Sequence, residues 1–152
     1  MSALIAKYLD AIYKDGARGE LSPCGRLLLD CWGLARLARV ELYGRQLLAS
    51  RGGEYQHDPE GFTARYREQI AEMVEIPEPV PGCVVAVIRR RTGYCCHVGL
   101  VTHDINRTGL GLHVLEINPG QNARMIPLYR FREANQLRVL KFYDDPGIPQ
   151  QT

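Results

Sequence analysis

The sequence lacks the features that mark exported, membrane-spanning and strongly nucleic-acid-binding proteins. Residues 1–7 do not combine a basic segment with an apolar core, and no apolar run approaches the length of a membrane-spanning helix. The chain also has little excess charge of either sign, because 19 basic and 17 acidic residues leave a net charge of +2. We therefore expect a protein made in the cytoplasm that neither inserts into membranes nor binds nucleic acid.

Cysteine patterns typical of metal sites and disulfide frameworks are missing as well. There is no Cys-x-x-Cys pair, and the adjacent Cys95 and Cys96 would point to opposite faces of a strand. The sequence therefore predicts no metal site and no cofactor. The five cysteines are an odd number, which together with the lack of an export signal favours reduced thiols.

The apolar spacing predicts an α+β fold. With 152 residues, 45% of them hydrophobic, we expect a single domain over residues 1–143 and a flexible tail over 144–152. Helical spacing predicts helices over 2–13, 31–43 and 62–74, and the glycine-rich segment 14–29 is predicted as an irregular loop. Short β-rich runs predict strands over 84–88, 98–102, 112–117, 124–128 and 137–143. Helices followed by strands are typical of N-terminal helices packed on a C-terminal antiparallel sheet, here of about five strands.

Cys31 is the candidate nucleophile because it is predicted in the first turn of a helix. Asp30 is a favoured N-cap, and Gly44 is a plausible stop. Unpaired N–H groups and the positive end of the helix dipole would favour the thiolate of Cys31 over its thiol. The alternative is that Cys31 is a small buried hydrophobe, as unpaired cysteines often are.

A catalytic cysteine needs a base, and the chain has four histidines that could supply it. His57 lies in a polar loop and His103 adjoins Asp104 at a turn, and both are predicted to be exposed. His113 lies within a strand. His97 opens the run 97–101 close to Gly99, where the missing side chain leaves room for a neighbouring backbone or a ligand. His97 is therefore the best candidate for the base.

Two motifs resemble those of the NlpC/P60 cysteine peptidases, particularly the branch found in bacteriophage tail assembly. Residues 30–34 (Asp-Cys-Trp-Gly-Leu) resemble the family's cysteine signature, and residues 97–101 (His-Val-Gly-Leu-Val) are similar to its histidine strand. Residues 80–85 resemble its entry into the first strand, and the resemblance extends over about residues 4–143. It implies a papain-like α+β fold in which Cys31 attacks an amide and His97 is partner and proton donor.

The resemblance also implies further residues around the thiol. The oxyanion would lie near the backbone N–H of Cys31, and Tyr13 matches a tyrosine of the family's site. We expect Tyr13, Trp32 and Asn118 to contact substrate or to support the oxyanion. The family's Pro-Tyr and Gly-Gly neighbours are missing, so an ordinary helix-end aromatic is the alternative for Tyr13.

The residue that orients the imidazole departs from the family, whose members carry His, Asn or Gln. The candidates are His113, Glu116 and Asn118. In a hairpin that pairs residue 102 with 111, residue 97 lies opposite 116, and a slip of two places it opposite 118. His113 would lie about 10 Å away. We predict Glu116, because a carboxylate accepts the imidazole N–H as well as an amide oxygen does. A solvent-facing strand residue is the alternative for Glu116.

The resemblance implies a peptidoglycan amide hydrolase of a phage tail. Its partners would be a bacterial cell-wall peptide and other tail proteins, and after synthesis in the host cytoplasm it would act from the tail in the bacterial envelope. Two alternatives stay open. A weakly active or inactive tail-tip assembly protein on the same fold would explain Cys83 in place of the family's acid. An acyltransferase is the third, because a thioester intermediate does not prescribe water as acceptor.

Overall fold

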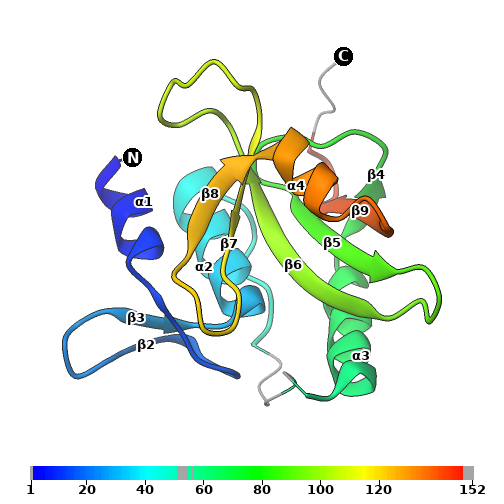
Figure 1. Cartoon of the computed structure of the whole chain (residues 1–152), viewed down its shortest axis with the longest axis horizontal. Helices are drawn as coiled ribbons and strands as arrows, with labels where there is room; N and C mark the ends of the chain where they lie inside the picture. Colours follow the sequence, from blue (N-terminus) through cyan, green and yellow to red (C-terminus); the bar gives the residue numbers. More distant parts are fainter. Residues whose placement is uncertain (1, 51–54, 56, 149–152) are drawn as a thin grey trace.

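The computed structural model describes residues 2–50, 55 and 57–148, which form four helices and nine strands (Figure 1). In chain order they are α1 (Ser2–Leu9), β1 (Ile12–Tyr13), β2 (Arg18–Leu21), β3 (Leu27–Leu29), α2 (Cys31–Tyr43), α3 (Pro59–Ile70), β4 (Val74–Ile76), β5 (Val84–Arg89), β6 (Cys95–Thr102), β7 (His113–Glu116), β8 (Arg124–Pro127), α4 (Leu128–Ala134) and β9 (Arg138–Asp144). The α+β class predicted from the sequence is confirmed.

The larger sheet has six strands in the order β4-β9-β5-β6-β7-β8, and each neighbouring pair is antiparallel. In Figure 1, α2 lies behind this sheet and α4 in front of it. The predicted sheet of about five strands lacked β4. Val74, predicted at the end of a helix, pairs instead with Asp144 at the end of β9. The preceding helix also starts earlier than predicted, because Asp58 caps it and Pro59 occupies its first turn.

A second, three-stranded sheet precedes α2 and corrects two predictions. The first helix ends at Leu9 rather than at residue 13, because Ile12 and Tyr13 pair in parallel with Leu28 and Leu29. The segment 14–29, predicted as a loop, contains β2 and β3, which pair antiparallel. Helical spacing continues through Ile12, so only the pairing with a strand further along the chain decides its conformation.

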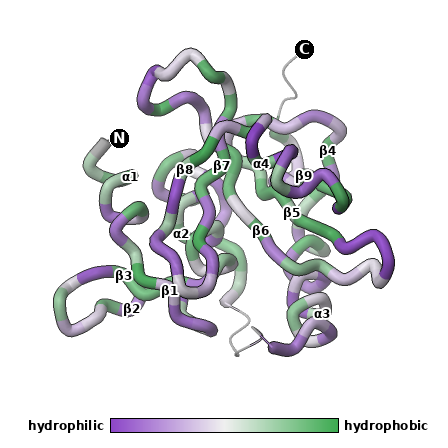
Figure 2. Tube along the Cα trace, viewed as in Figure 1, coloured by the Kyte–Doolittle hydropathy of each residue, from purple (hydrophilic) through white to green (hydrophobic). Residues whose placement is uncertain are grey.

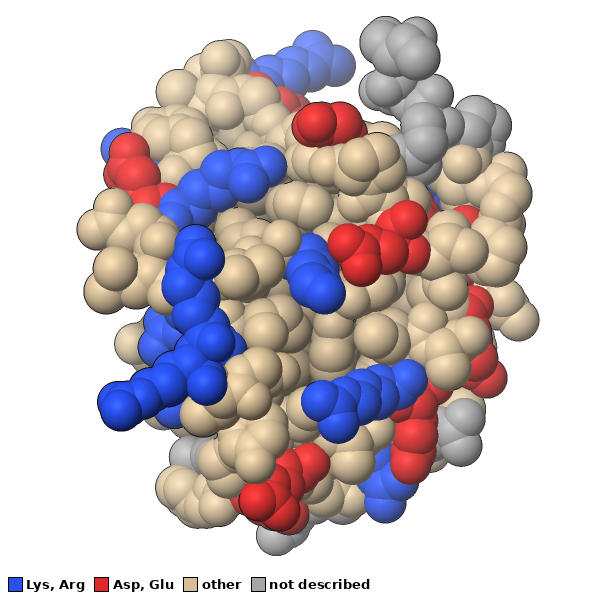
Figure 3. Space-filling model, turned by 90° about the vertical axis from the view of Figure 1, so that its right-hand side faces the viewer, with Lys and Arg blue, Asp and Glu red and all other residues tan. Residues whose placement is uncertain are grey.

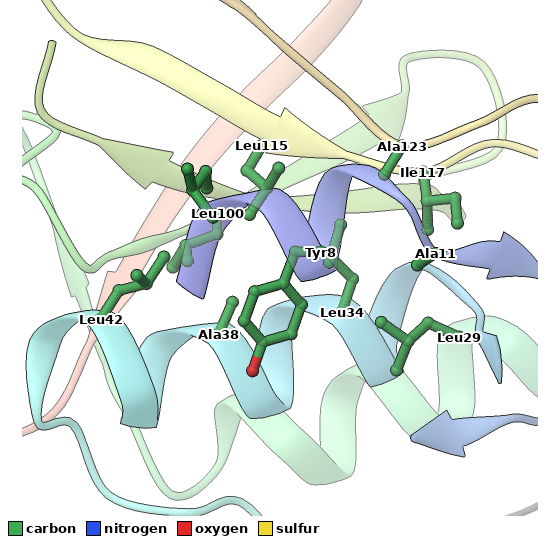
Figure 4. Packing of buried hydrophobic residues seen from close by; sticks show 11 residues of the cluster. Tyr8, Ala11, Leu29, Leu34, Ala38, Leu42, Leu100, Leu115, Ile117 and Ala123 are labelled. Atoms are coloured by element: carbon green, nitrogen blue, oxygen red, sulfur yellow. The ribbon is translucent and has the colours of Figure 1, made fainter. Parts of the chain in front are cut away.

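The face of α2 that packs on the larger sheet forms one part of the core (Figure 4). Leu34, Ala38 and Leu42 contact the same cluster as Leu100 of β6 and Leu115 of β7. The other side of the sheet is covered by α4, whose Phe131 packs with valines of β5, β6 and β7. Because both faces are covered, β5 is buried at five consecutive positions and is green along most of its length in Figure 2.

The last strand extends beyond the boundary predicted for a flexible tail. Asp144 is the last residue of β9 and is fully buried, and its carboxylate lies 2.9 Å from Nε of Arg45 and 3.7 Å from Nη2 of Arg39. Asp145 also pairs with Arg39, at 2.6 Å. Residues 149–152 lie outside the described residues. Within the described part, no helix has the length and apolar character needed to cross a bilayer.

Candidate active site

Cys31 is the first residue of α2, as the capping pattern predicted. Asp30 accepts a hydrogen bond from the N–H of Gly33 at 2.8 Å and one from the N–H of Gly16 at 3.0 Å. The same carboxylate lies 2.6 Å from the guanidinium of Arg18. One side chain thus caps α2 and ties its start to the segment that leads into β2. The predicted stop at Gly44 is also present, with a left-handed φ of 63°.

One cavity brings together five of the six residues proposed for the site. Tyr13, Cys31, Trp32, His97 and Asn118 all line it. Trp32 is 5% exposed, and its indole N–H is a buried donor without a hydrogen-bond partner in the described structure. A buried donor without an acceptor is costly to the folded state.

The ionisation expected for Cys31 is reversed by its surroundings. Burial raises the pKa of the Cys31 thiol well above its ordinary value, and the charge of Asp30 adds to the increase. A hydrogen bond from the Val98 backbone works in the other direction but does not compensate. Burial likewise raises the pKa of Tyr13, and the negative charges of Asp15 and Asp30 add to the increase. In this structure Cys31 is therefore a neutral thiol at neutral pH.

His97 is held by Glu116, the partner predicted for it. Nε2 of His97 lies 2.7 Å from Oε1 of Glu116, and Arg124 donates from Nε to the other carboxylate oxygen at 2.9 Å. Asn118 donates to Oε1 at 3.4 Å. Burial alone would raise the pKa of Glu116, but the hydrogen bond and charge of His97 and the charge of Arg124 outweigh it and hold the pKa below its usual value. The carboxylate is therefore ionised at neutral pH.

The strand register behind this contact differs from the predicted one by two residues. Thr102 pairs with His113 and Leu100 with Leu115, so continuing the register places His97 opposite Asn118. Glu116 then lies across from Gly99 and reaches His97 diagonally. A Cβ on Gly99 would lie 2.8 Å from Val114 Cγ1, which explains why a glycine stands here.

His97 and Cys31 lie on opposite faces of the larger sheet. Val98, the next residue after His97, packs in the same cluster as Cys31 and Trp32, on the α2 side. The His97 ring instead lies 6.5 Å from the ring of Phe131 in α4. No hydrogen bond in the described structure joins the imidazole to the thiol. The expected Cys-His contact is thus absent from this conformation, although both residues border one cavity.

A β-bulge in β6 lies directly beside His97. Val87 pairs with His97, but the next residue, Ile88, pairs with Cys95, so Cys96 is an extra residue in β6. Cys95 packs on the α2 side, whereas Cys96 packs with the cluster on the α4 side. Two consecutive residues, Cys96 and His97, therefore share the α4 face.

Two of the remaining three histidines have local partners. His57 is exposed, as predicted. His103, also predicted to be exposed, is half-buried, and its Nδ1 lies 2.6 Å from the hydroxyl of Tyr43. His113 is buried, with Nδ1 2.8 Å from the carbonyl oxygen of Gly111. Among the described residues, no group of three or more His, Cys, Asp or Glu side chains is placed to hold a metal ion.

Comparison of the chain with known protein families, curated proteins and solved structures gave no match. The fold and the site by themselves define an α+β protein with a buried cysteine at a helix start and a His-Glu-Arg cluster on the other face of the sheet. The resemblance of residues 30–34 and 97–101 to a peptidase family stays an expectation from the sequence.

Proposed function

We propose that this protein is a cysteine-dependent amide hydrolase with a papain-like NlpC/P60 fold, which cuts peptides of bacterial peptidoglycan from a phage tail. The observation that carries the proposal is the position of Cys31 at the capped start of α2, in a cavity that Tyr13, Trp32 and His97 also line. A thiol at a helix start lies beside unpaired N–H groups that can stabilise an oxyanion.

The reaction would proceed through a thioester. His97 takes the proton of the Cys31 thiol while sulfur attacks the amide carbon, and the negative charge develops on the carbonyl oxygen near the N–H of Cys31. The imidazolium then protonates the leaving amine as the C–N bond breaks. Water, deprotonated by His97, hydrolyses the thioester and restores the thiol. Glu116 orients the ring and stabilises its charged form.

This chemistry requires His97 to reach the α2 side of the sheet. If the bulge moves by one position, so that His97 rather than Cys96 is the extra residue, its side chain joins that of Val98 on the face of Cys31. The side chains of Cys95 and Val98 keep their present faces in both arrangements. The conformation described here is then a resting form with a neutral thiol.

A second candidate function is a tail-tip assembly protein without catalysis. The separation of His97 from Cys31 and the raised pKa of the thiol favour it. In that case Cys31 is a packing residue, and the His97–Glu116–Arg124 cluster stabilises the sheet.

Turnover of purified peptidoglycan separates the two functions. The hydrolase predicts release of peptides or amines by the parent, complete loss in Cys31→Ala, and no change in Cys24→Ala, because Cys24 is exposed and does not line the cavity. His97→Ala should reduce the rate by about 10²- to 10⁴-fold. No release by the folded parent contradicts the hydrolase.

Two substitutions of Glu116 test its orienting role in the same assay. Glu116→Gln keeps an acceptor for the imidazole N–H but removes the charge, whereas Glu116→Ala removes both. An orienting role predicts a much larger loss of kcat for alanine than for glutamine, with both variants folded. Equal activity of both variants and the parent would mean that Glu116 has no part in turnover.

A further inference from the structure

Unpaired arginines gather at the end of the sheet that carries the β5–β6 hairpin. Arg89 of β5 lies directly opposite Arg138 of β9, and Arg90 and Arg91 follow in the exposed turn. Figure 3 shows this side of the molecule, where a contiguous group of basic side chains lies apart from most acidic ones. None of these four arginines forms an ion pair in the described structure, although many other arginines do.

Two adjoining depressions are lined by these residues, and we call them together the arginine groove. Arg89, Ala134 and Arg138 line both, Arg90 and Arg91 line one, and Asn135 lines the other. Two acidic residues are present. Glu116 is engaged by His97 and Arg124, and Glu133 makes no ion pair with the arginines. The groove therefore holds more guanidinium groups than carboxylates.

The pair of Arg89 and Arg138 points to a ligand. Like charges directly opposite each other on neighbouring strands destabilise a sheet, so the pair carries a cost in the free protein. Carboxylates bind guanidinium groups through two parallel hydrogen bonds, and an anion between the two arginines would remove the repulsion. The neighbouring amides of Asn118 and Asn135 offer further hydrogen bonds to a peptide backbone.

We propose that the arginine groove binds the carboxylates of an acidic peptide segment. A nucleic acid is less suited, because no Trp, Tyr or Phe lines the groove for stacking and the net charge is only +2. The groove is also continuous with the Cys31 cavity, since Arg89, Cys96, His97 and Asn118 line both. An extended peptide held by its carboxylates has a path toward that cavity. The binding itself does not depend on catalysis by Cys31.

Anisotropy of a fluorescent oligoglutamate peptide at low ionic strength tests this site. Arg89→Gln/Arg138→Gln should weaken binding about fivefold for each guanidinium removed. The matched control, Arg67→Gln/Arg107→Gln, removes the same charge from two exposed arginines elsewhere and should leave the Kd within about twofold. The thermal midpoint of the first variant should not fall, because a repulsive pair is lost.

Three results would overturn the proposal. One is the absence of binding to the parent, and another is an equal loss of affinity in the two double variants, which would reflect net charge alone. The third is competition, through the same arginines, by an oligothymidylate or by inorganic phosphate at lower concentrations than by unlabelled oligoglutamate. An oligoglutamine peptide should not compete, because it lacks the carboxylates.

Discussion

Burial, more than position in the helix, sets the ionisation of Cys31. The dipole and free N–H groups of a helix start stabilise an anion by roughly 0.3–2 kcal/mol. Removing the charge from water costs more than this in an enclosed site, and the carboxylate of Asp30 adds repulsion. The balance leaves a protonated thiol, so any activity at neutral pH needs a base that reaches the sulfur.

Alkylation with iodoacetamide checks this balance. Cys24 is exposed, and a hydrogen bond from Ser22 lowers the pKa of its thiol, so it should be labelled first at neutral pH. Cys31 should react slowly, and its rate should keep rising above the pH at which Cys24 reaches its plateau. Peptide mapping by mass spectrometry measures both rates. If Cys31 of the folded protein reacts faster than Cys24 at neutral pH, the thiol is activated and the resting form described here is not the main one in solution.

Several residues of the site were predictable from the sequence, but the ionisation of Cys31 and the face of the sheet on which each residue lies were not. The motifs identified Cys31 and its cap, and Glu116 contacts His97 as predicted, although the strand register used to select it was wrong by two residues. The strict alternation of a strand would then fix which residues share a face, but one extra residue at Cys96 breaks this alternation. Nothing in the local sequence locates such a bulge, because it depends on the pairing with β5.

At the scale of elements, Asp30 caps α2 and also links the start of this helix to the three-stranded sheet. Asp30 binds the N–H of Gly16 and the guanidinium of Arg18 in addition to Gly33. The contact is close, because a Cβ on Gly33 would lie 2.4 Å from the carbonyl oxygen of Ala17. The position of Cys31 in the cavity therefore depends on this junction.

Asp30→Ala should destabilise the protein more than the loss of an ordinary cap. Three interactions are lost and Arg18 is left without its partner, so we expect a cost of about 2–4 kcal/mol. Asp58 is the matched control, because it caps α3 through the N–H of Gly61 and is exposed, and Asp58→Ala should cost about 1 kcal/mol. Urea unfolding of the two variants gives both values. Equal costs would mean that the contacts of Asp30 to Gly16 and Arg18 contribute nothing to stability.

The elements predicted correctly are those whose apolar pattern can be seen in the local sequence. The five strands after Gly82 and the long helix α2 carry periodic apolar patterns, and the structure contains all of them. The strands β1 to β3 have two to four residues each and exist only through pairing with one another. The short helix α4 has two buried residues, Leu128 and Phe131, too few to set a pattern. It forms because Phe131 fills the face of the sheet that α2 leaves open.

At the scale of the whole molecule, helices cover both faces of the larger sheet, and three thiols are buried in the core. Cys31, Cys83 and Cys95 are all buried, and burial raises the pKa of Cys83 and of Cys95 to about 12. In the unfolded chain each would ionise near its ordinary pKa of about 8.5. The folded protein therefore keeps protons that the unfolded chain loses as the pH rises.

This difference should make the folded protein less stable at alkaline pH, and single cysteine variants can measure the contribution of each thiol. Above about pH 8.5 the unfolded chain binds fewer protons than the folded protein, so the free energy of unfolding should fall by about 1.4 kcal/mol per pH unit for each buried thiol. Cys83→Ala loses some packing energy at every pH. Its free energy of unfolding should nevertheless fall less steeply with pH than that of the parent, by the contribution of one buried thiol. Cys24→Ala should keep the parent's slope in the same range, because Cys24 is exposed. Urea midpoints measured from neutral pH to about pH 10.5 give these slopes. A slope for Cys83→Ala equal to that of the parent would show that Cys83 ionises within the folded protein, and hence that water reaches this part of the core.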